Sequence, residues 1–179
     1  FGLAFIGTQK GGRFDIRSDV AVHMISQQGN PNGRPNSDVV RPWVNGSDLT
    51  KRSRGMWIID FGVDMPEDEA SQYEAPFEYV RKFVKPAREK SRSEARTTSI
   101  WWLHQRPRPE MRESLAPLSR YIATPRVSKH RIFVWQSTRV LPDSAVVVIA
   151  RDDSYFLGVL QSRWHELWAR GTGTQLREA

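Results

Sequence analysis

Apolar residues recur along the chain with two periods, a strand-like period of two and a helical period near 3.6. Short apolar runs between turn formers predict buried strands at 55–61 and 145–150. From Asp152, a helical period predicts one long amphipathic helix that has this residue as its N-cap and ends at Gly171 and Gly173. Its expected buried face consists of Phe156, Val159, Leu160, Trp164, Leu167 and Trp168.

Shorter elements are expected in the rest of the chain. Residues 1–16 combine an apolar run, a turn and an alternating run, which predicts a β-hairpin. Ser18 is the expected N-cap of the helix that follows. Pro76 is expected to divide a helical segment at 66–80, and the polar segment 88–96 is expected to be exposed. Further strands are predicted at 39–44, 100–103, 121–124 and 131–135, and a further helix at 107–119.

Helices and strands are mixed here without the regular alternation that a doubly wound parallel sheet requires. The expected fold is therefore α+β, with a largely antiparallel or mixed sheet, flanking helices and the long C-terminal helix. The chain has 179 residues, of which 39% are hydrophobic, and we expect one domain over 1–179. No apolar run approaches the ~18 residues of a membrane-spanning helix. The absence of Cys excludes disulfides and is typical of a cytoplasmic protein.

Positive charge is concentrated in the middle third of the chain. The net charge is +7, yet residues 81–139 include fifteen Lys and Arg against four acidic residues, whereas 1–80 and 140–179 are slightly acidic. This concentration favours a polyanionic partner, because phosphates that are neutralised by cations release their counterions. The alternative is a solvated basic surface on an ordinary globular protein, and charge alone does not decide between the two.

Motifs typical of enzyme active sites are absent from the sequence. There is no GxGxxG or P-loop segment and no Gly-x-Ser-x-Gly turn, and the four His residues do not form an HExxH. Neither a catalytic nor a metal site is therefore expected. Asp152 and Asp153 are better explained by helix capping than by metal binding. Asp60 is the only starting point for a nuclease centre, but no Glu-x-Lys follows it at close spacing.

The segment PRVSKHR, which spans Pro125 to Arg131, is the most informative basic element. It places Arg126, Lys129 and Arg131, with the hydroxyl of Ser128, in a short connection between two predicted strands. Loops on a rigid sheet commonly carry binding residues, and Arg and Lys contact guanine edges or phosphates. We therefore expect this loop to face DNA.

Two interpretations of the segment differ in what its cations contact. In the structural one they pair with Glu110, Glu113 or the acidic residues at 67–69, and in the DNA-facing one they have no partner in the protein. Trp57 and Trp135 are expected to lie in the core rather than to stack on bases. Additional phosphate contacts are expected from Arg106, Arg108, Arg112, Arg120, Lys51, Arg52 and Arg54.

Several segments, in this order, resemble the target-recognition region of large single-chain DNA methyltransferases. They are GTQKGGRF, VVRPWVNGSDL followed by GMWIIDF, YIATPRVSKHR, and FLGVLQSRWHELWARGTGTQLR. The family comprises the MmeI-like type IIL restriction–modification enzymes and the PglX-like methyltransferases of phage-defence systems. The resemblance covers nearly the whole chain.

In this family a class I methyltransferase domain precedes the recognition region and transfers a methyl group from S-adenosylmethionine to adenine N6. The family's Asn-Pro-Pro-Tyr motif and its Gly-containing cofactor motif are absent from this chain. The resemblance thus implies a DNA-recognition module, itself without catalysis or cofactor, within a longer bacterial cytoplasmic enzyme. It also implies base-reading positions at Arg177 and Ala179.

Double-stranded DNA and the methyltransferase domain of the same parent chain are the partners that the resemblance implies, and no membrane is involved. A small metal-dependent nuclease, another nucleic-acid-processing domain and a basic protein-interaction domain are the alternatives.

Overall fold

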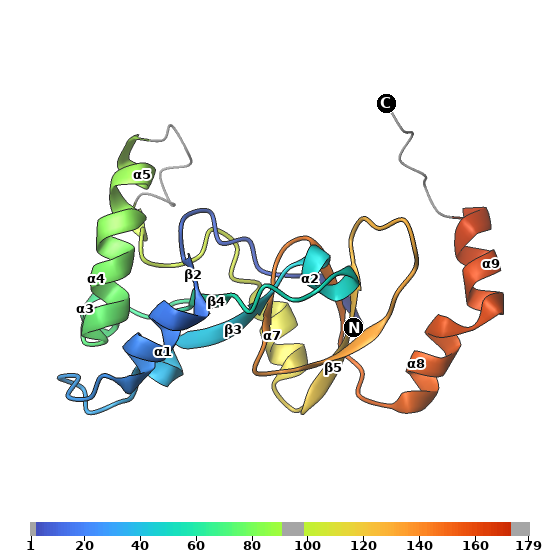
Figure 1. Ribbon diagram of the computed structural model, residues 1–179, viewed down its shortest axis with the longest axis horizontal. Helices are drawn as coiled ribbons and strands as arrows, with labels where there is room; N and C mark the ends of the chain where they lie inside the picture. The colour runs from blue at the N-terminus through green and yellow to red at the C-terminus, as the bar shows by residue number, and fades with distance from the viewer. Residues whose placement is uncertain (1–2, 91–98, 173–179) are drawn as a thin grey trace.

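The computed structural model describes residues 3–90 and 99–172 (Figure 1). It confirms the α+β class, with two four-stranded sheets and helices packed on them. The strands are β1 (Ala4–Ile6), β2 (Asp15–Ile16), β3 (Val40–Val44), β4 (Trp57–Ile59), β5 (Arg120–Pro125), β6 (Val134–Ser137), β7 (Leu141–Pro142) and β8 (Val146–Ile149). The helices are α1 (Ser18–Ser26), the 3-10 turn η1 (Asn36–Asp38), α2 (Gly46–Thr50), α3 (Glu67–Ser71), α4 (Glu74–Phe83), α5 (Lys85–Lys90), α7 (Pro109–Leu115), α8 (Ser154–Gln161) and α9 (Arg163–Thr172).

The first sheet has the strand order β1-β8-β5-β6, and all of its neighbouring strands are antiparallel. Because side chains alternate along a strand, the two faces of β5 enter different apolar clusters. Tyr121 and Ala123 pack with Met111 and Leu115 of α7, whereas Ile122 packs on the other face with side chains of α8. Helices therefore cover both faces of this sheet, which gives the loops at its strand ends a rigid base.

The second sheet has the order β2-β4-β3-β7, in which β3 and β7 are parallel and the other pairs antiparallel. It carries the largest apolar cluster, to which α1, α3 and α4 contribute. Phe14, Ile58 and Ile59 are fully buried there, as are Tyr73 and Val80 from the helical side. This cluster is the main core of the molecule.

The chain passes directly from one sheet into the other between β7 and β8. The amide of Asp143, the residue after β7, donates to the carbonyl of Val44 in β3, and its own carbonyl accepts from the amide of Val146, where β8 begins. In Figure 1, α3, α4 and α5 stand at one end of the molecule and α8 and α9 at the other, with the two sheets between them.

Several predicted elements are confirmed, with shorter bounds. The strands expected at 39–44, 55–61, 121–124 and 145–150 correspond to β3, β4, β5 and β8, and the helix expected at 107–119 corresponds to α7. The strand expected at 131–135 begins only at Val134, so that the basic loop before it is longer than predicted.

The predicted hairpin at 1–16 is wrong. β1 pairs with β8 and β2 pairs with β4, so these two neighbouring strands belong to different sheets. Two predicted helix boundaries are also wrong. Arg17 rather than Ser18 is the N-cap of α1, and the break expected at Pro76 lies before Glu74. Pro76 is instead in the first turn of α4, where a missing N–H costs nothing.

The strand expected at 100–103 is a turn, and its Trp101 and Trp102 are buried in the main core. The exposed segment expected at 88–96 is wrong at Arg88, which is 3% exposed. Its guanidinium donates to the carbonyls of Lys10, Trp101 and Leu103, among others, and so joins the first loop of the chain to this turn. Residues 91–98 lie outside the described residues.

Two C-terminal helices, α8 and α9, replace the single long helix that the pattern predicts. The backbone of Ser162 is extended and separates them, and the N-cap of α8 is Asp153 rather than Asp152. α9 runs through Gly171 to Thr172. Of the six residues of the expected buried face, only Phe156 and Leu160 pack on the first sheet, where Leu157 joins them. The other four are exposed, Val159 by 43%, Trp164 by 82%, Leu167 by 55% and Trp168 by 64%.

None of the described helices combines the length and the apolar character that crossing a membrane requires.

Candidate functional site

The β5–β6 loop, residues 126–133, is the most exposed basic feature of the first sheet. Every residue from Arg126 to Arg131 is exposed. The amide of Arg126 donates to the carbonyl of Ala145, the residue before β8, at 2.8 Å, which fixes the start of the loop. Within the loop, Ser128 Oγ accepts from the amide of His130.

The side chains of Arg126 and Lys129 make no hydrogen bond or ion pair with any described residue. The structural interpretation of this loop required acidic partners at Glu110, Glu113 or 67–69, and these two cations do not pair with them in the part of the chain that the structure covers. Their charges are therefore directed to solvent, as the DNA-facing interpretation expects. Contact with DNA itself stays a prediction.

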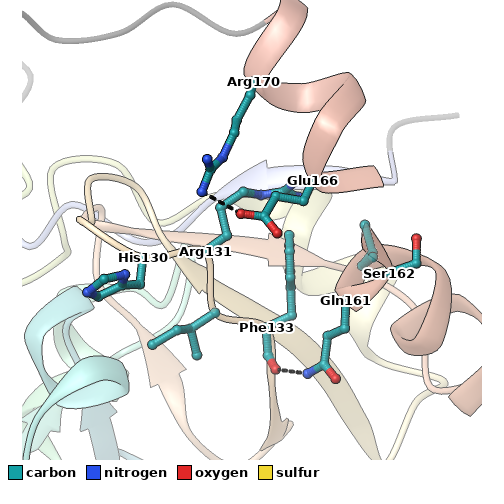
Figure 2. A pocket seen from close by; sticks show the side chains of 9 residues that line it. His130, Arg131, Phe133, Gln161, Ser162, Glu166 and Arg170 are labelled. Carbon is teal, nitrogen blue, oxygen red and sulfur yellow. Dashed lines mark hydrogen bonds and ion pairs between the residues drawn. The ribbon is translucent and has the colours of Figure 1, made fainter. Parts of the chain in front are cut away.

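Arg131 differs from the other two cations of the loop. It donates to the carbonyl of His165 at 3.0 Å and contacts His165 Nδ1 at 2.8 Å, so that it attaches the end of the loop to α9. A hollow of about 480 Å³ lies beside this contact. Figure 2 shows Arg131 and Phe133 on one side of it, facing Gln161 and Glu166 on the other.

The helix α2 lies at the other side of the same loop. Asn45 and Asp48 form a capping box at its start, and Gly46 lets it approach the sheet, because a Cβ there would come within 2.8 Å of the Ala145 carbonyl oxygen. An open groove of about 720 Å³ separates the start of α2 from Arg126 and Val127. The loop therefore lies between two helices, α2 and α9.

The basic cluster after α2 divides into paired and unpaired cations. Arg54 forms a forked ion pair with Asp48 at 2.9 Å, which keeps the pKa of Asp48 at about 2. Lys51 and Arg52 are exposed, and neither has a side-chain partner among residues 3–90 and 99–172. These two cations follow a helix that is packed on β5, so they come to the same end of the first sheet as the β5–β6 loop.

Asp60 is the centre of a buried ion cluster that links the two sheets. Its side chain is 2% exposed and receives two hydrogen bonds from Arg112 of α7, at 2.8 and 2.9 Å, and one from Arg41 of β3 at 3.4 Å. His104 lies 3.7 Å from it and donates from Nε2 to the carbonyl of Ile59. The carboxylate is therefore compensated within the protein, which leaves no acidic start for a nuclease centre at Asp60.

Burial and charge act in opposite directions on this cluster. Burial alone would raise the pKa of Asp60, but the charges of Arg112 and Arg41 and the hydrogen bonds from Arg112 outweigh it and keep the pKa at about 2. For His104 burial dominates and lowers the pKa to about 4, although Asp60 opposes the shift. Near neutral pH the cluster thus holds one carboxylate, two guanidinium groups and a neutral imidazole.

Of the other predicted phosphate contacts, Arg120 and Arg108 form hydrogen bonds within the protein, and Arg106 is exposed. Arg120 donates to the carbonyl of Asp152 and lies 3.9 Å above the ring of Trp135. Arg108, with a positive φ of 60°, donates to the carbonyl of Gly7. Arg106 is exposed, and its backbone bridges the first loop of the chain. Roles of these residues in DNA binding stay predictions, and Arg177 lies outside the described residues.

No protein-family model matches the chain, and no curated protein matches it. A solved structure shares the fold of this chain. It is the type IIL restriction–modification enzyme MmeI in complex with DNA, with a TM-score of 0.74 at 17% sequence identity. The match covers 98% of this chain and 23% of the MmeI chain, so the chain spans about a quarter of the length of that enzyme. At this identity the comparison shows a common fold.

Because the match covers 98% of this chain, it extends over both sheets. Among the described residues, no three His, Asp or Glu side chains are grouped so that they could hold a metal ion. Asp153, one of the two acids considered for such a site, caps α8 through a hydrogen bond from the amide of Phe156.

Sequence reasoning missed two residues that shape the loop. Gly46 permits the close approach of α2, and His165 holds the far end of the loop. A glycine directly after the capping residue Asn45 is a weak signal of the first. Nothing in the sequence indicates the second, because His165 lies 34 residues from its partner on an otherwise ordinary helix.

Proposed function

We propose that this chain is a double-stranded DNA recognition module, which reads a short sequence for a DNA adenine methyltransferase of the restriction–modification or phage-defence type. The methyltransferase domain of the longer enzyme would bind S-adenosylmethionine and modify the base. The observation that carries the proposal is that the side chains of Arg126 and Lys129 have no partner within the described structure. The fold that the chain shares with MmeI, an enzyme solved in complex with DNA, supports it.

Unpaired cations matter because a guanidinium already bound to a carboxylate adds little to the attraction of a phosphate. Arg112 and Arg54 have such partners, whereas Arg126, Lys129, Lys51 and Arg52 have none among residues 3–90 and 99–172. The last four lie at one end of the first sheet and form the proposed DNA-binding face. Loops of this kind position the protein through phosphates and read base edges with Arg or Lys in the major groove.

The chain itself contributes binding rather than chemistry in this proposal. In the part of the chain that the structure describes, no three His, Asp or Glu side chains are grouped to hold a metal ion, and the buried carboxylate of Asp60 is ion-paired with Arg112 and Arg41. Incubation of the purified chain with duplex DNA and labelled S-adenosylmethionine is therefore expected to give no methylated DNA. Methyl transfer by this chain alone would refute the proposed division of labour.

The test compares binding of random-sequence DNA duplexes at different salt concentrations, measured by fluorescence anisotropy. Wild-type affinity should fall steeply between about 50 and 200 mM salt, with about −0.9 in log–log slope for each phosphate contact. The double variant Arg126→Ala/Lys129→Ala should bind more weakly, with a slope that is less steep by about 2.

A matched control removes the same charge elsewhere. Arg17 and Arg81 form exposed ion pairs with Asp19 and Glu78, on α1 and α4 at the opposite end of the molecule. Arg17→Ala/Arg81→Ala should keep the wild-type slope. Equal effects of the two double variants would mean that only net charge attracts DNA, and an unchanged slope in the first would remove the loop from the interface.

A further inference from the structure

We propose that Arg131 is not a DNA contact but a positioning residue, which with His165 of α9 holds the β5–β6 loop in the shape that presents Arg126 and Lys129. We call this contact the Arg131–His165 clasp. The inference rests on the proposed DNA-binding function, and it changes the role of the one loop cation that the structure places against another element.

The guanidinium of Arg131 is occupied on its edge and on its face. Its Nη1 donates to the carbonyl oxygen of His165 at 3.0 Å, and its Nη2 lies 2.8 Å from Nδ1 of the same residue. Its Cζ atom lies over the Phe133 ring, 5.1 Å from the ring centre. A fork that is bound to one residue and covered by a ring is poorly placed to contact a guanine edge.

The partner side of the clasp is itself fixed. The amide of His165 donates to Ser162 Oγ at 3.2 Å, and its Nδ1 lies 2.8 Å from both Arg131 Nη2 and the carbonyl oxygen of Leu160. Because an arginine N–H only donates and a carbonyl oxygen only accepts, Nδ1 forms a hydrogen bond with one of these two groups at a time. The imidazole stacks on Trp168 at 5.8 Å and lies 6.0 Å from Phe133. His165 is therefore held at the α8–α9 corner, so a side chain that binds it acquires a fixed position.

A second link joins the same two segments. Gln161, the last residue of α8, donates to the carbonyl oxygen of Phe133 at 2.7 Å, as the dashed line in Figure 2 shows. With the hydrogen bond of Arg126 to Ala145, the loop is fixed at its start by β8 and at its end by the α8–α9 corner. Between these two fixed ends, Lys129 has no side-chain hydrogen bond or ion pair with another described element.

Fixation of both ends lowers the entropy that the loop loses when it binds. A loop freed from α9 still carries the same cations and can reach the same phosphates, but it must be ordered first. Loss of the clasp should therefore weaken DNA binding without changing the number of phosphate contacts. Loss of a direct contact would instead reduce the salt slope by about 0.9.

The experiment uses Arg131→Lys and His165→Ala in the full chain, because neither removes a cation from the loop. Trypsin cleavage after Arg126 and Lys129, followed by mass spectrometry without DNA, reports on the order of the loop. Arg131→Lys, which loses the guanidinium fork, should be cleaved about tenfold faster than wild type. His165→Ala loses the imidazole but keeps the backbone carbonyl that accepts from Nη1, so it should be cleaved faster than wild type by a smaller factor. Arg170→Lys is the matched control, since Arg170 lines the same hollow but pairs with Glu166, and it should be cleaved at the wild-type rate.

DNA affinity is then measured on the same proteins with the duplexes used above. Arg131→Lys and His165→Ala should each lower the affinity about three- to tenfold with an unchanged salt slope, and the double variant should be no weaker than Arg131→Lys alone. An unchanged cleavage rate in both variants overturns the clasp whether or not DNA binds. Faster cleavage of the two variants, together with a wild-type chain that does not bind DNA, would support the clasp and refute the proposed function.

A direct role for Arg131 predicts the opposite pattern. Arg131→Ala would then reduce the salt slope, and His165→Ala would leave both affinity and slope at wild-type values. That combination also overturns the proposal.

Discussion

Arg112 and Arg126 are the same residue type in the same basic third of the chain, and their guanidinium groups have opposite surroundings. Arg112 donates twice to a carboxylate that is almost fully buried, whereas Arg126 is exposed and has no side-chain partner in the described structure. A count of cations along the sequence treats the two as equal. The position of Asp60, 52 residues before Arg112, makes one of them structural.

Arg112→Ala is expected to destabilise the fold by about 3–5 kcal/mol, because it leaves the buried Asp60 carboxylate without its main partner. Arg126→Ala should change the free energy of unfolding by no more than about 0.5 kcal/mol. Urea unfolding of both variants, followed by circular dichroism, measures the difference. Similar stabilities of the two variants would show that the Asp60 cluster does not hold the fold.

The neutral state of His104 predicts a pH dependence of stability. Its pKa is about 4 in the folded protein and 6.5 as the reference value for an unfolded chain, so between these values only the unfolded state takes up a proton. Stability should therefore fall as the pH falls from about 6.5 to about 4, by an amount on the order of 3 kcal/mol at about 1.4 kcal/mol per unit. Asp60, with its low folded pKa, adds a further loss only below about pH 4.

Thermal unfolding at several pH values tests this, with His104→Gln as the comparison. The amide of Gln can donate to the Ile59 carbonyl as Nε2 of His104 does, but it does not titrate. The variant should lose less stability than wild type between pH 6.5 and 4. Parallel curves would mean that the buried imidazole contributes nothing to acid sensitivity.

At the scale of elements, the sequence correctly predicts strands whose apolar runs are buried in a core. Its predictions are wrong where the pairing of a segment depends on residues far away in the chain. β4, β5 and β8 can be predicted from the sequence because each contributes buried side chains from a short apolar run. The pairing of residues 1–16 cannot be predicted in this way, because β1 pairs with β8, which lies more than a hundred residues later in the chain. The turn at 100–103 shows the same limit, since its Trp side chains are buried without any strand.

The candidate site follows a similar division. The β5–β6 loop could be identified from its cations between two apolar runs, because local sequence determines both strands and the loop between them. The partners of Arg131 and Arg112, which are His165 and Asp60, could not be identified from the sequence, because they lie 34 and 52 residues away. The helical period after Asp153 is correct, but it does not reveal the break at Ser162 or the exposure of Trp164.

The contact between α2 and the first sheet depends on the missing side chain of Gly46. Gly46→Ala would place a Cβ 2.8 Å from the Ala145 carbonyl oxygen, so we expect a loss of about 1–3 kcal/mol and weaker DNA binding as α2 moves. Gly158 in α8 has open space around its Cα, and Gly158→Ala should stabilise the protein by up to about 1 kcal/mol with unchanged binding. Thermal melts and anisotropy on this pair measure both effects. A stable Gly46→Ala variant with full affinity would show that the close approach is unimportant.

At the scale of the whole molecule, the strands of the two sheets alternate along the chain: β1 of the first sheet precedes β2, β3 and β4 of the second, and β7 of the second lies between β6 and β8 of the first. Refolding of the protein should therefore be slow, in the range of milliseconds to seconds that is typical of non-local strand pairing. Stopped-flow tryptophan fluorescence after dilution from urea measures the rate. Complete refolding within microseconds would indicate that local contacts dominate the transition state.

The pairing of β1 with β8 also determines the order of events during synthesis. Ala4 and Ile149 are partners 145 positions apart, and β8 lies between β1 and β5 in the sheet. At ribosomal rates of about 5–20 residues per second, β1 waits on the order of ten seconds for the strand that completes it. During that interval the nascent chain exposes an unpaired apolar segment, Leu3–Ile6, which makes it a candidate client for chaperones that bind hydrophobic segments.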